Sequence, residues 1–84
     1  MPIIHHIEPA YGPLNQLVTI YGNDFGKDNS RVIFGPVEAQ VASWTDNKIE
    51  ASFPSASQQV AGIVWISVIV NNTTSNSVPF TIKS

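Results

Sequence analysis

The sequence predicts an all-β fold, a sandwich of two packed sheets built from about seven short strands. Turn-forming residues recur about every eight to twelve positions, which is typical of sandwiches and barrels. The runs between these turns are rich in isoleucine and valine, whose branched side chains favour pleated, half-buried surfaces. No window has the apolar spacing of an amphipathic helix. A chain of 84 residues with this pattern is expected to form one domain, residues 1–84.

The predicted turns consist of glycine, proline, asparagine and aspartate, the residues that most readily adopt turn conformations. They divide the chain into seven β-rich runs, the strand count of a constant-type immunoglobulin sandwich. The predicted strands are Ile3–Ile7, Leu17–Tyr21, Arg31–Phe34, Ala39–Trp44, Lys48–Phe53, Ile63–Val70 and Val78–Ile82.

Alternation of apolar and polar residues indicates which face of each strand is buried. In the run from Lys48 to Phe53, the apolar side chains of Ile49, Ala51 and Phe53 alternate with polar neighbours. Because successive side chains point to opposite faces of a strand, these three residues are expected to point inward. Two sheets with such inner faces pack around a core about 10 Å thick.

Composition and charge exclude several classes of function. Charged residues make up only 12% of the chain and the net charge is −2, with four scattered cations, so no basic stripe for nucleic acid is expected. No apolar run reaches the roughly 18 residues of a membrane span. The start of the chain lacks a signal peptide, and we expect this domain to be excised from a larger protein. There is no cysteine, so no disulfide is expected.

Several motifs along the chain together resemble one family, the IPT/TIG domains. The motifs are Pro9 with Gly12, the run Val18–Gly26 (VTIYGNDFG), Val32–Gly35 (VIFG), Ser43–Ile49 (SWTDNKI) with Pro54 after it, and Ser75–Asn76 followed by Phe80. The resemblance covers nearly the whole chain. It implies an immunoglobulin-like sandwich of the early-set type, similar to the small sandwich domain of cyclodextrin glucanotransferases and to modules of bacterial surface proteins.

The motif residues also have a structural interpretation of their own. Gly22, Gly26 and Gly35 stand at predicted strand exits, where a positive φ or a close backbone approach is expected. Phe25 is expected to fold back over the end of the core. The pair Asp46–Asn47 joins two β-rich runs and predicts a tight turn.

No constellation of residues predicts catalysis, a metal or a cofactor. The adjacent histidines, His5 and His6, are expected to point to opposite faces of an edge strand and therefore cannot share one ligand. Asp24, Asp28 and Asn29 lack the regular spacing of a calcium loop, so a turn is the favoured interpretation.

Two further features each leave an alternative open. The segment Asn71–Thr74 contains two overlapping glycosylation patterns, which we interpret as a polar hairpin loop. Trp44 is expected to pack at the edge of the sandwich, with ligand contact as the alternative.

The run from Ile63 to Val70 is the most informative stretch, because seven of its eight residues are apolar. A sandwich strand has only one inner face, and Val64, Ile66 and Val68 match the core positions of the family. The opposite side chains are then expected to point outward, together with Ile33 on a neighbouring strand. This apolar row indicates an interface, unless a loop or the chain terminus covers Trp65. The expected interaction surface consists of Ile33, Ile63, Trp65 and Ile69.

Two hypotheses of function follow. The first is a non-catalytic structural or protein-interaction module of a larger, extracellular bacterial protein, docking on neighbouring domains or on a second copy through this apolar face. The second, implied by the glucanotransferase resemblance, is a carbohydrate-associated accessory domain. Exposed aromatic rings stack on sugar faces, and the candidates are Trp65 and Tyr21, with Ser67 as a polar group on the same strand face as Trp65.

Overall fold

The computed structural model describes residues 1–13, 16–26, 30–35, 37–52 and 62–82. In these ranges the chain forms strands without helices. The strands are β1 (Ile3–Glu8), β2 (Tyr11–Gly12), β3 (Val18–Asn23), β4 (Ser30–Phe34), β5 (Val37–Glu38), β6 (Gln40–Trp44), β7 (Lys48–Ser52), β8 (Gly62–Val70), β9 (Thr73–Thr74) and β10 (Val78–Ile82).

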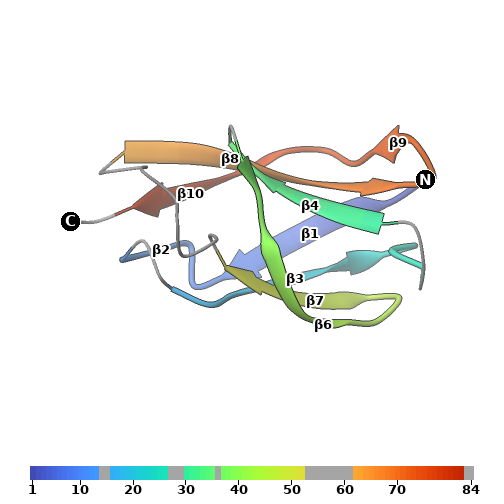
Figure 1. The fold of residues 1–84 in the computed structure, drawn as a ribbon, viewed down its shortest axis with the longest axis horizontal. Helices are drawn as coiled ribbons and strands as arrows, with labels where there is room; N and C mark the ends of the chain where they lie inside the picture. Colours follow the sequence, from blue (N-terminus) through green and yellow to red (C-terminus); the bar gives the residue numbers. More distant parts are fainter. Residues whose placement is uncertain (14–15, 27–29, 36, 53–61, 83–84) are drawn as a thin grey trace.

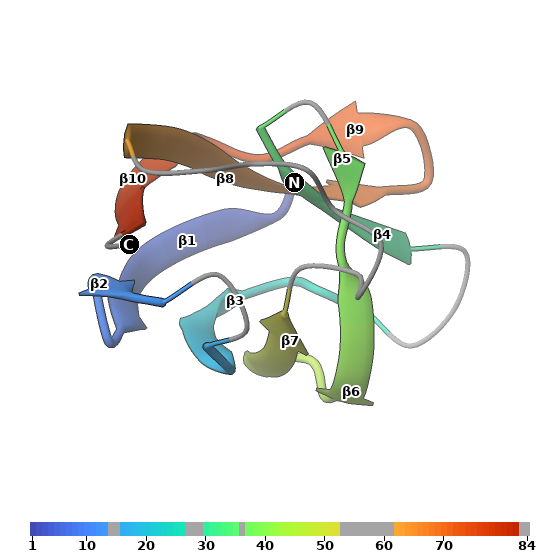
Figure 2. The same cartoon turned by 60° about the vertical axis from the view of Figure 1, so that its left-hand side comes forward.

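The strands form two sheets that pack face to face (Figure 1). One sheet, here the β3 sheet, has the order β1-β3-β7-β6. The other, the β8 sheet, has the order β2-β10-β8-β4-β5, and β9 pairs with the end of β8. The chain passes from the β8 sheet to the β3 sheet between β5 and β6 (Figure 2). The start of β1 and the end of β10 lie at opposite ends of the long axis. The predicted all-β sandwich is therefore confirmed.

All seven predicted strands are present, and their ends differ from the prediction by no more than two residues. The structure adds three strands of two residues each, β2, β5 and β9. Each is too short to show an alternating pattern, and β2 is defined only by its parallel pairing with β10. Segments this short are recognisable only when their partner strand is in place.

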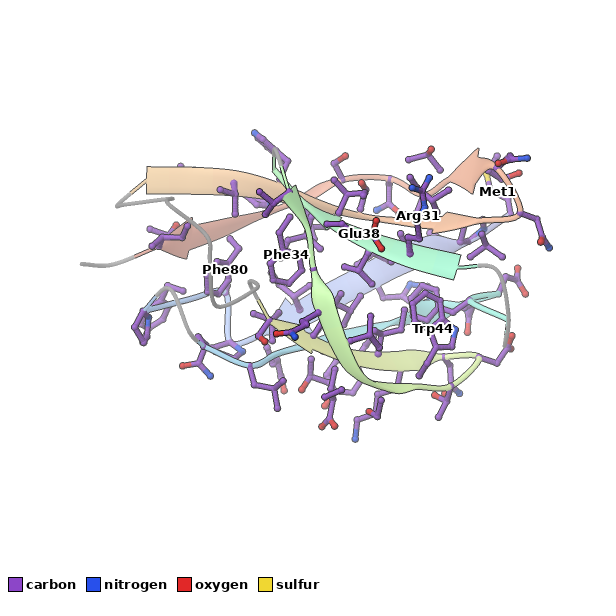
Figure 3. All side chains as sticks on the ribbon, viewed as in Figure 1. Met1, Arg31, Phe34, Glu38, Trp44 and Phe80 are labelled. Carbon is purple, nitrogen blue, oxygen red and sulfur yellow. The ribbon has the colours of Figure 1, made fainter. Side chains whose placement is uncertain are left out.

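The core lies between the sheets and follows the predicted alternation. Val64, Ile66 and Val68 are buried, as are Ile49 and Ala51 on the facing sheet. Phe53 lies outside the described residues. Figure 3 shows Phe34 and Phe80 pointing into the space between the sheets, and both are completely buried.

Alternation fails on β1, where His5 and His6 are both exposed between the buried Ile4 and Ile7. The expectation that the two histidines point to opposite faces is wrong, because the register with β3 shifts between Ile4 and His6. A bulge of this kind adds one residue to the strand and breaks the two-residue period.

Two polar side chains close one open side of the sandwich. Asn76 accepts a hydrogen bond from the amide of Ile4 (2.7 Å) and donates one to its carbonyl (3.0 Å), so it pairs with the edge strand as a backbone would. Ser75 does the same for β8, since its hydroxyl accepts from the Val68 amide and its own amide donates to the Val68 carbonyl, both at 2.8 Å. The Ser-Asn motif therefore connects the two sheets.

A second network joins the β6–β7 turn to the loop after β3. The Trp44 indole donates to the carbonyls of Phe25 (3.2 Å) and Gly26 (2.8 Å). Asp46 accepts from the Gly26 amide at 3.0 Å, and its own carbonyl accepts from the Phe25 amide at 2.8 Å. Phe25 is completely buried and meets the Trp44 ring edge-on at 6.4 Å. Trp44 thus packs at the edge of the sandwich, as predicted.

The predictions for the motif glycines are also confirmed. Gly26 and Gly35 have φ angles of 71° and 62°, which glycine adopts without steric cost. At Gly22 the constraint is space rather than φ, because a Cβ there would collide with the Ile3 carbonyl oxygen and the Phe25 ring.

The Asn76 contacts lead to a stability prediction. Replacing Asn76 with alanine leaves the amide and carbonyl of Ile4 without their partner, which is expected to cost about 1–3 kcal/mol of unfolding free energy. Ser77→Ala, an exposed position one residue further on, is the matched control. Urea denaturation measures both variants, and equal stabilities for the two would contradict the proposed role of Asn76.

Candidate interaction surface

The outer face of the β8 sheet carries the exposed apolar side chains of the longest strand. Ile63 is 61% exposed and Trp65 is 56% exposed, while their neighbours Val64 and Ile66 are buried. The ring of Trp65 therefore lies outside the core, and none of the described residues shields it fully. Burial of the inward residues is what directs these two side chains outward, since both faces of one strand cannot enter the same core.

Cross-strand pairing shows which residues share this face with Trp65. Side chains of directly paired residues lie on the same side of a sheet. Thr81 of β10 pairs with Ile63 on one side and with Tyr11 of β2 on the other, and Pro79 pairs with Trp65. We call these residues the aromatic end of the face: Tyr11, Ile63, Trp65, Pro79 and Thr81.

The other half of the face carries charge. Ile33 is opposite Ser67, and Ile69 is opposite Arg31, so both isoleucines point outward as predicted, but both are half-buried. Arg31 lies 3.8 Å from Glu38, an exposed ion pair that contributes at most about 1 kcal/mol. Because the isoleucines of this half are half-buried whereas Tyr11, Ile63 and Trp65 are exposed, the exposed apolar surface is concentrated at the aromatic end.

Tyr21 lies on the opposite sheet from Trp65. It belongs to β3, and its ring stacks on the imidazole of His6, with ring centroids 4.7 Å apart and planes inclined by 16°. Since the two sheets point their outer faces in opposite directions, Tyr21 and Trp65 do not contribute to one binding site. The two residues predicted as sugar-stacking candidates therefore lie on separate surfaces of the domain.

The remaining sequence candidates form no site in the described residues. No group of three or more His, Asp or Glu residues in those ranges is placed to hold a metal ion. Asp24 has a left-handed φ of 64°, in line with the turn interpretation, and Asp28 and Asn29 lie outside the described residues. Asn71 and Asn72, both with positive φ, form the turn between β8 and β9, which confirms the predicted hairpin loop. Nor does this part of the chain contain a helix long and apolar enough to span a membrane.

Sequence reasoning missed three members of the aromatic end, Pro79, Thr81 and the aromatic residue Tyr11. Of these three, Tyr11 is the one with an exposed ring. It is 57% exposed and lies between Pro9 and the pair Gly12–Pro13, a context that predicts a turn. Its position next to Thr81 depends on a parallel pairing between strands that are far apart in the sequence. No local pattern signals such a pairing.

The two-sheet topology and the hydrogen-bonded motifs define an immunoglobulin-like β-sandwich. The family model for the IPT/TIG domain matches residues 2–82, and the chain belongs to that family. The resemblance proposed from the motifs is therefore confirmed.

The relatives are bacterial enzymes of which this chain matches a small part. It is 34% identical over 79 residues to a cyclomaltodextrin glucanotransferase of Bacillus sp. (strain 6.6.3), covering 90% of this chain and 11% of the enzyme. The crystal structure of the γ-cyclodextrin glucanotransferase from alkalophilic Bacillus clarkii superposes with a TM-score of 0.82 at 29% identity, covering 96% of this chain and 12% of that one.

The fold is also found outside this group of enzymes. The solution structure of the TIG domain of human nuclear factor of activated T-cells, cytoplasmic 4, has a TM-score of 0.73 at 17% identity, covering 98% of this chain and 87% of that one. At this identity the likeness shows the fold alone.

Which side chains of β8 point into the core can be tested by comparing two neighbouring substitutions. Trp65→Ser is expected to cost about 1 kcal/mol or less, because much of the ring is already in water. Ile66→Ala is expected to cost about 2–5 kcal/mol, because it empties a fully buried position. Urea denaturation of both variants measures the difference. A Trp65→Ser cost as large as that of Ile66→Ala would show that the ring is buried in solution.

Proposed function

We propose that this domain is a non-catalytic interaction module of a larger, extracellular bacterial protein, which docks on neighbouring domains or on a second copy through the outer face of the β8 sheet. The observation that carries the proposal is the exposure of Ile63 and Trp65 side by side on one regular strand. Contiguous exposed apolar surface of this kind usually marks a contact site in soluble proteins. Tryptophan is also among the residues that contribute most to binding energy at interfaces.

Several observations support the accessory role. The chain corresponds to only 11–12% of the glucanotransferases with which it aligns over most of its length, so in those proteins the rest of the chain supplies other domains. Catalysis needs a nucleophile or acid with a positioned partner, and the described residues bring no such group together. An extracellular location belongs to the same proposal.

The size of the face limits how tight such docking can be. Five strands spaced about 4.8 Å apart and about 20 Å of strand length give roughly 500 Å² on one partner. Two such faces bury about 1,000 Å², which is below the roughly 1,200 Å² at which specific, stable protein interfaces begin. A second copy is therefore expected to bind weakly, with association detectable only at high protein concentration.

Self-association through this face is tested by sedimentation equilibrium over a range of protein concentrations. The wild-type domain is expected to show a monomer–dimer equilibrium that shifts strongly toward monomer in Trp65→Ser. Val41→Ser is the matched control, because Val41 is 41% exposed but lies on β6 of the other sheet. Strictly monomeric wild-type protein, or equal dimerisation of both variants, would exclude a dimer through the β8 sheet.

A carbohydrate-associated role is the second candidate function. The similarity to cyclomaltodextrin glucanotransferases supports it, as does an exposed indole ring with hydroxyl groups beside it on the same face. Binding sites for small molecules combine apolar surface with a few polar groups of this kind.

Intrinsic tryptophan fluorescence tests this second candidate. Trp44 is half-buried and bonded to two carbonyls, so a sugar is expected to change the emission of Trp65 in preference to that of Trp44. Addition of maltooligosaccharides to the wild-type domain should therefore change the emission, and the change should disappear in Trp65→Ser. An unchanged wild-type spectrum at millimolar sugar concentrations would count decisively against a carbohydrate role.

A further inference from the structure

We infer that Tyr11 and Trp65 together form a stacking platform for a neutral oligosaccharide, with the Thr81 hydroxyl between them. The inference rests on the carbohydrate-associated function proposed above and identifies the site and the kind of ligand. Both rings are more than half exposed, and cross-strand pairing places both on the outer face of the β8 sheet.

The spacing of the two rings suits a chain of sugars. Tyr11 lies two strands away from β8 and is displaced by two residues from the level of Trp65. With strands about 4.8 Å apart and about 3.4 Å per residue, the two Cα atoms are roughly 12 Å apart. That distance exceeds the width of one hexose ring, so only an oligosaccharide covers both aromatic rings at once.

Polar groups accompany the rings where a sugar would present its hydroxyls. Thr81 pairs directly with Tyr11 and lies diagonally across from Trp65, while Ser67 follows Trp65 on the same face of β8. A hydroxyl both donates and accepts hydrogen bonds, as sugar hydroxyls do. Aromatic faces cover the C–H surface of a pyranose, and these two side chains are placed to bond its edge.

Charge and area both favour a small neutral ligand over a protein at this end. None of the described residues of the aromatic end is an acid or a base, and the Arg31–Glu38 pair lies at the other end of the face. The aromatic end is about half of the face, roughly 250 Å². A specific protein interface needs about 800 Å² per partner, so this end alone is too small for one.

The experiment is a titration of the isotope-labelled domain followed by two-dimensional NMR. Maltoheptaose and cellohexaose test α- and β-linked glucose chains, and glucose tests a single ring. One of the two oligosaccharides is expected to shift the signals of Tyr11, Thr81 and the Trp65 indole, with glucose binding far more weakly. Tyr11→Ala and Trp65→Ala should each lower the affinity about tenfold, the upper range for one aromatic contact.

Controls separate the possible outcomes. Tyr21→Ala removes a tyrosine from the opposite sheet and should leave the affinity unchanged, and Tyr11→Leu keeps an apolar side chain without the ring if Tyr11→Ala does not fold. Binding that survives the loss of the Tyr11 ring overturns the platform but leaves a carbohydrate role through Trp65. No shift with either oligosaccharide overturns both proposals. Shifts at the same residues that depend on protein concentration alone would identify the surface as a protein interface and overturn the platform.

Discussion

The inward packing of Val64, Ile66 and Val68 is the interaction on which the rest of this structure depends. These three side chains fill the centre of the β8 sheet's inner face and are buried against the β3 sheet. Burial of apolar side chains contributes roughly 1.5–3 kcal/mol each, and a domain without a disulfide has little else to hold it together. Once this row is inside, Ile63 and Trp65 have no place in the core, so the exposed face is a direct consequence of core formation.

The sequence motifs of the family are explained by hydrogen bonds that join segments far apart in the chain. Trp44 and Asp46 hold the loop that contains Phe25 and Gly26, and Asn76 pairs with the backbone of Ile4. The motif of Trp44 and Asp46 thus has its partner in the motif of Phe25 and Gly26, whereas Asn76 bonds to backbone outside the motifs. In a small sandwich such side-chain bonds take the place of backbone pairing where one strand ends and the next sheet begins.

The exposed face has two halves with different physical character. The half around Ile33 and Ile69 is partly covered and carries the Arg31–Glu38 pair, whereas the aromatic end presents open rings and hydroxyls without charge. A large partner would have to contact both halves to bury sufficient area, while an oligosaccharide needs only the aromatic end. The two proposed functions therefore use overlapping surfaces but make different demands on them, and the fold alone is compatible with either.

Local pattern was sufficient for the seven long strands, the inward phase of β8 and the outward position of Trp65, because side-chain alternation is a property of each strand by itself. Local pattern was insufficient where the position of a residue depends on the strand with which its own strand pairs. The bulge at His5 and His6 arises from pairing with β3, the separation of Tyr21 from Trp65 arises from sheet order, and Tyr11 reaches the face only through β10. The amino-acid sequence by itself determined the seven longer strands and the inward face of β8. Only the tertiary structure decided which exposed residues become neighbours, because that depends on pairings between distant segments.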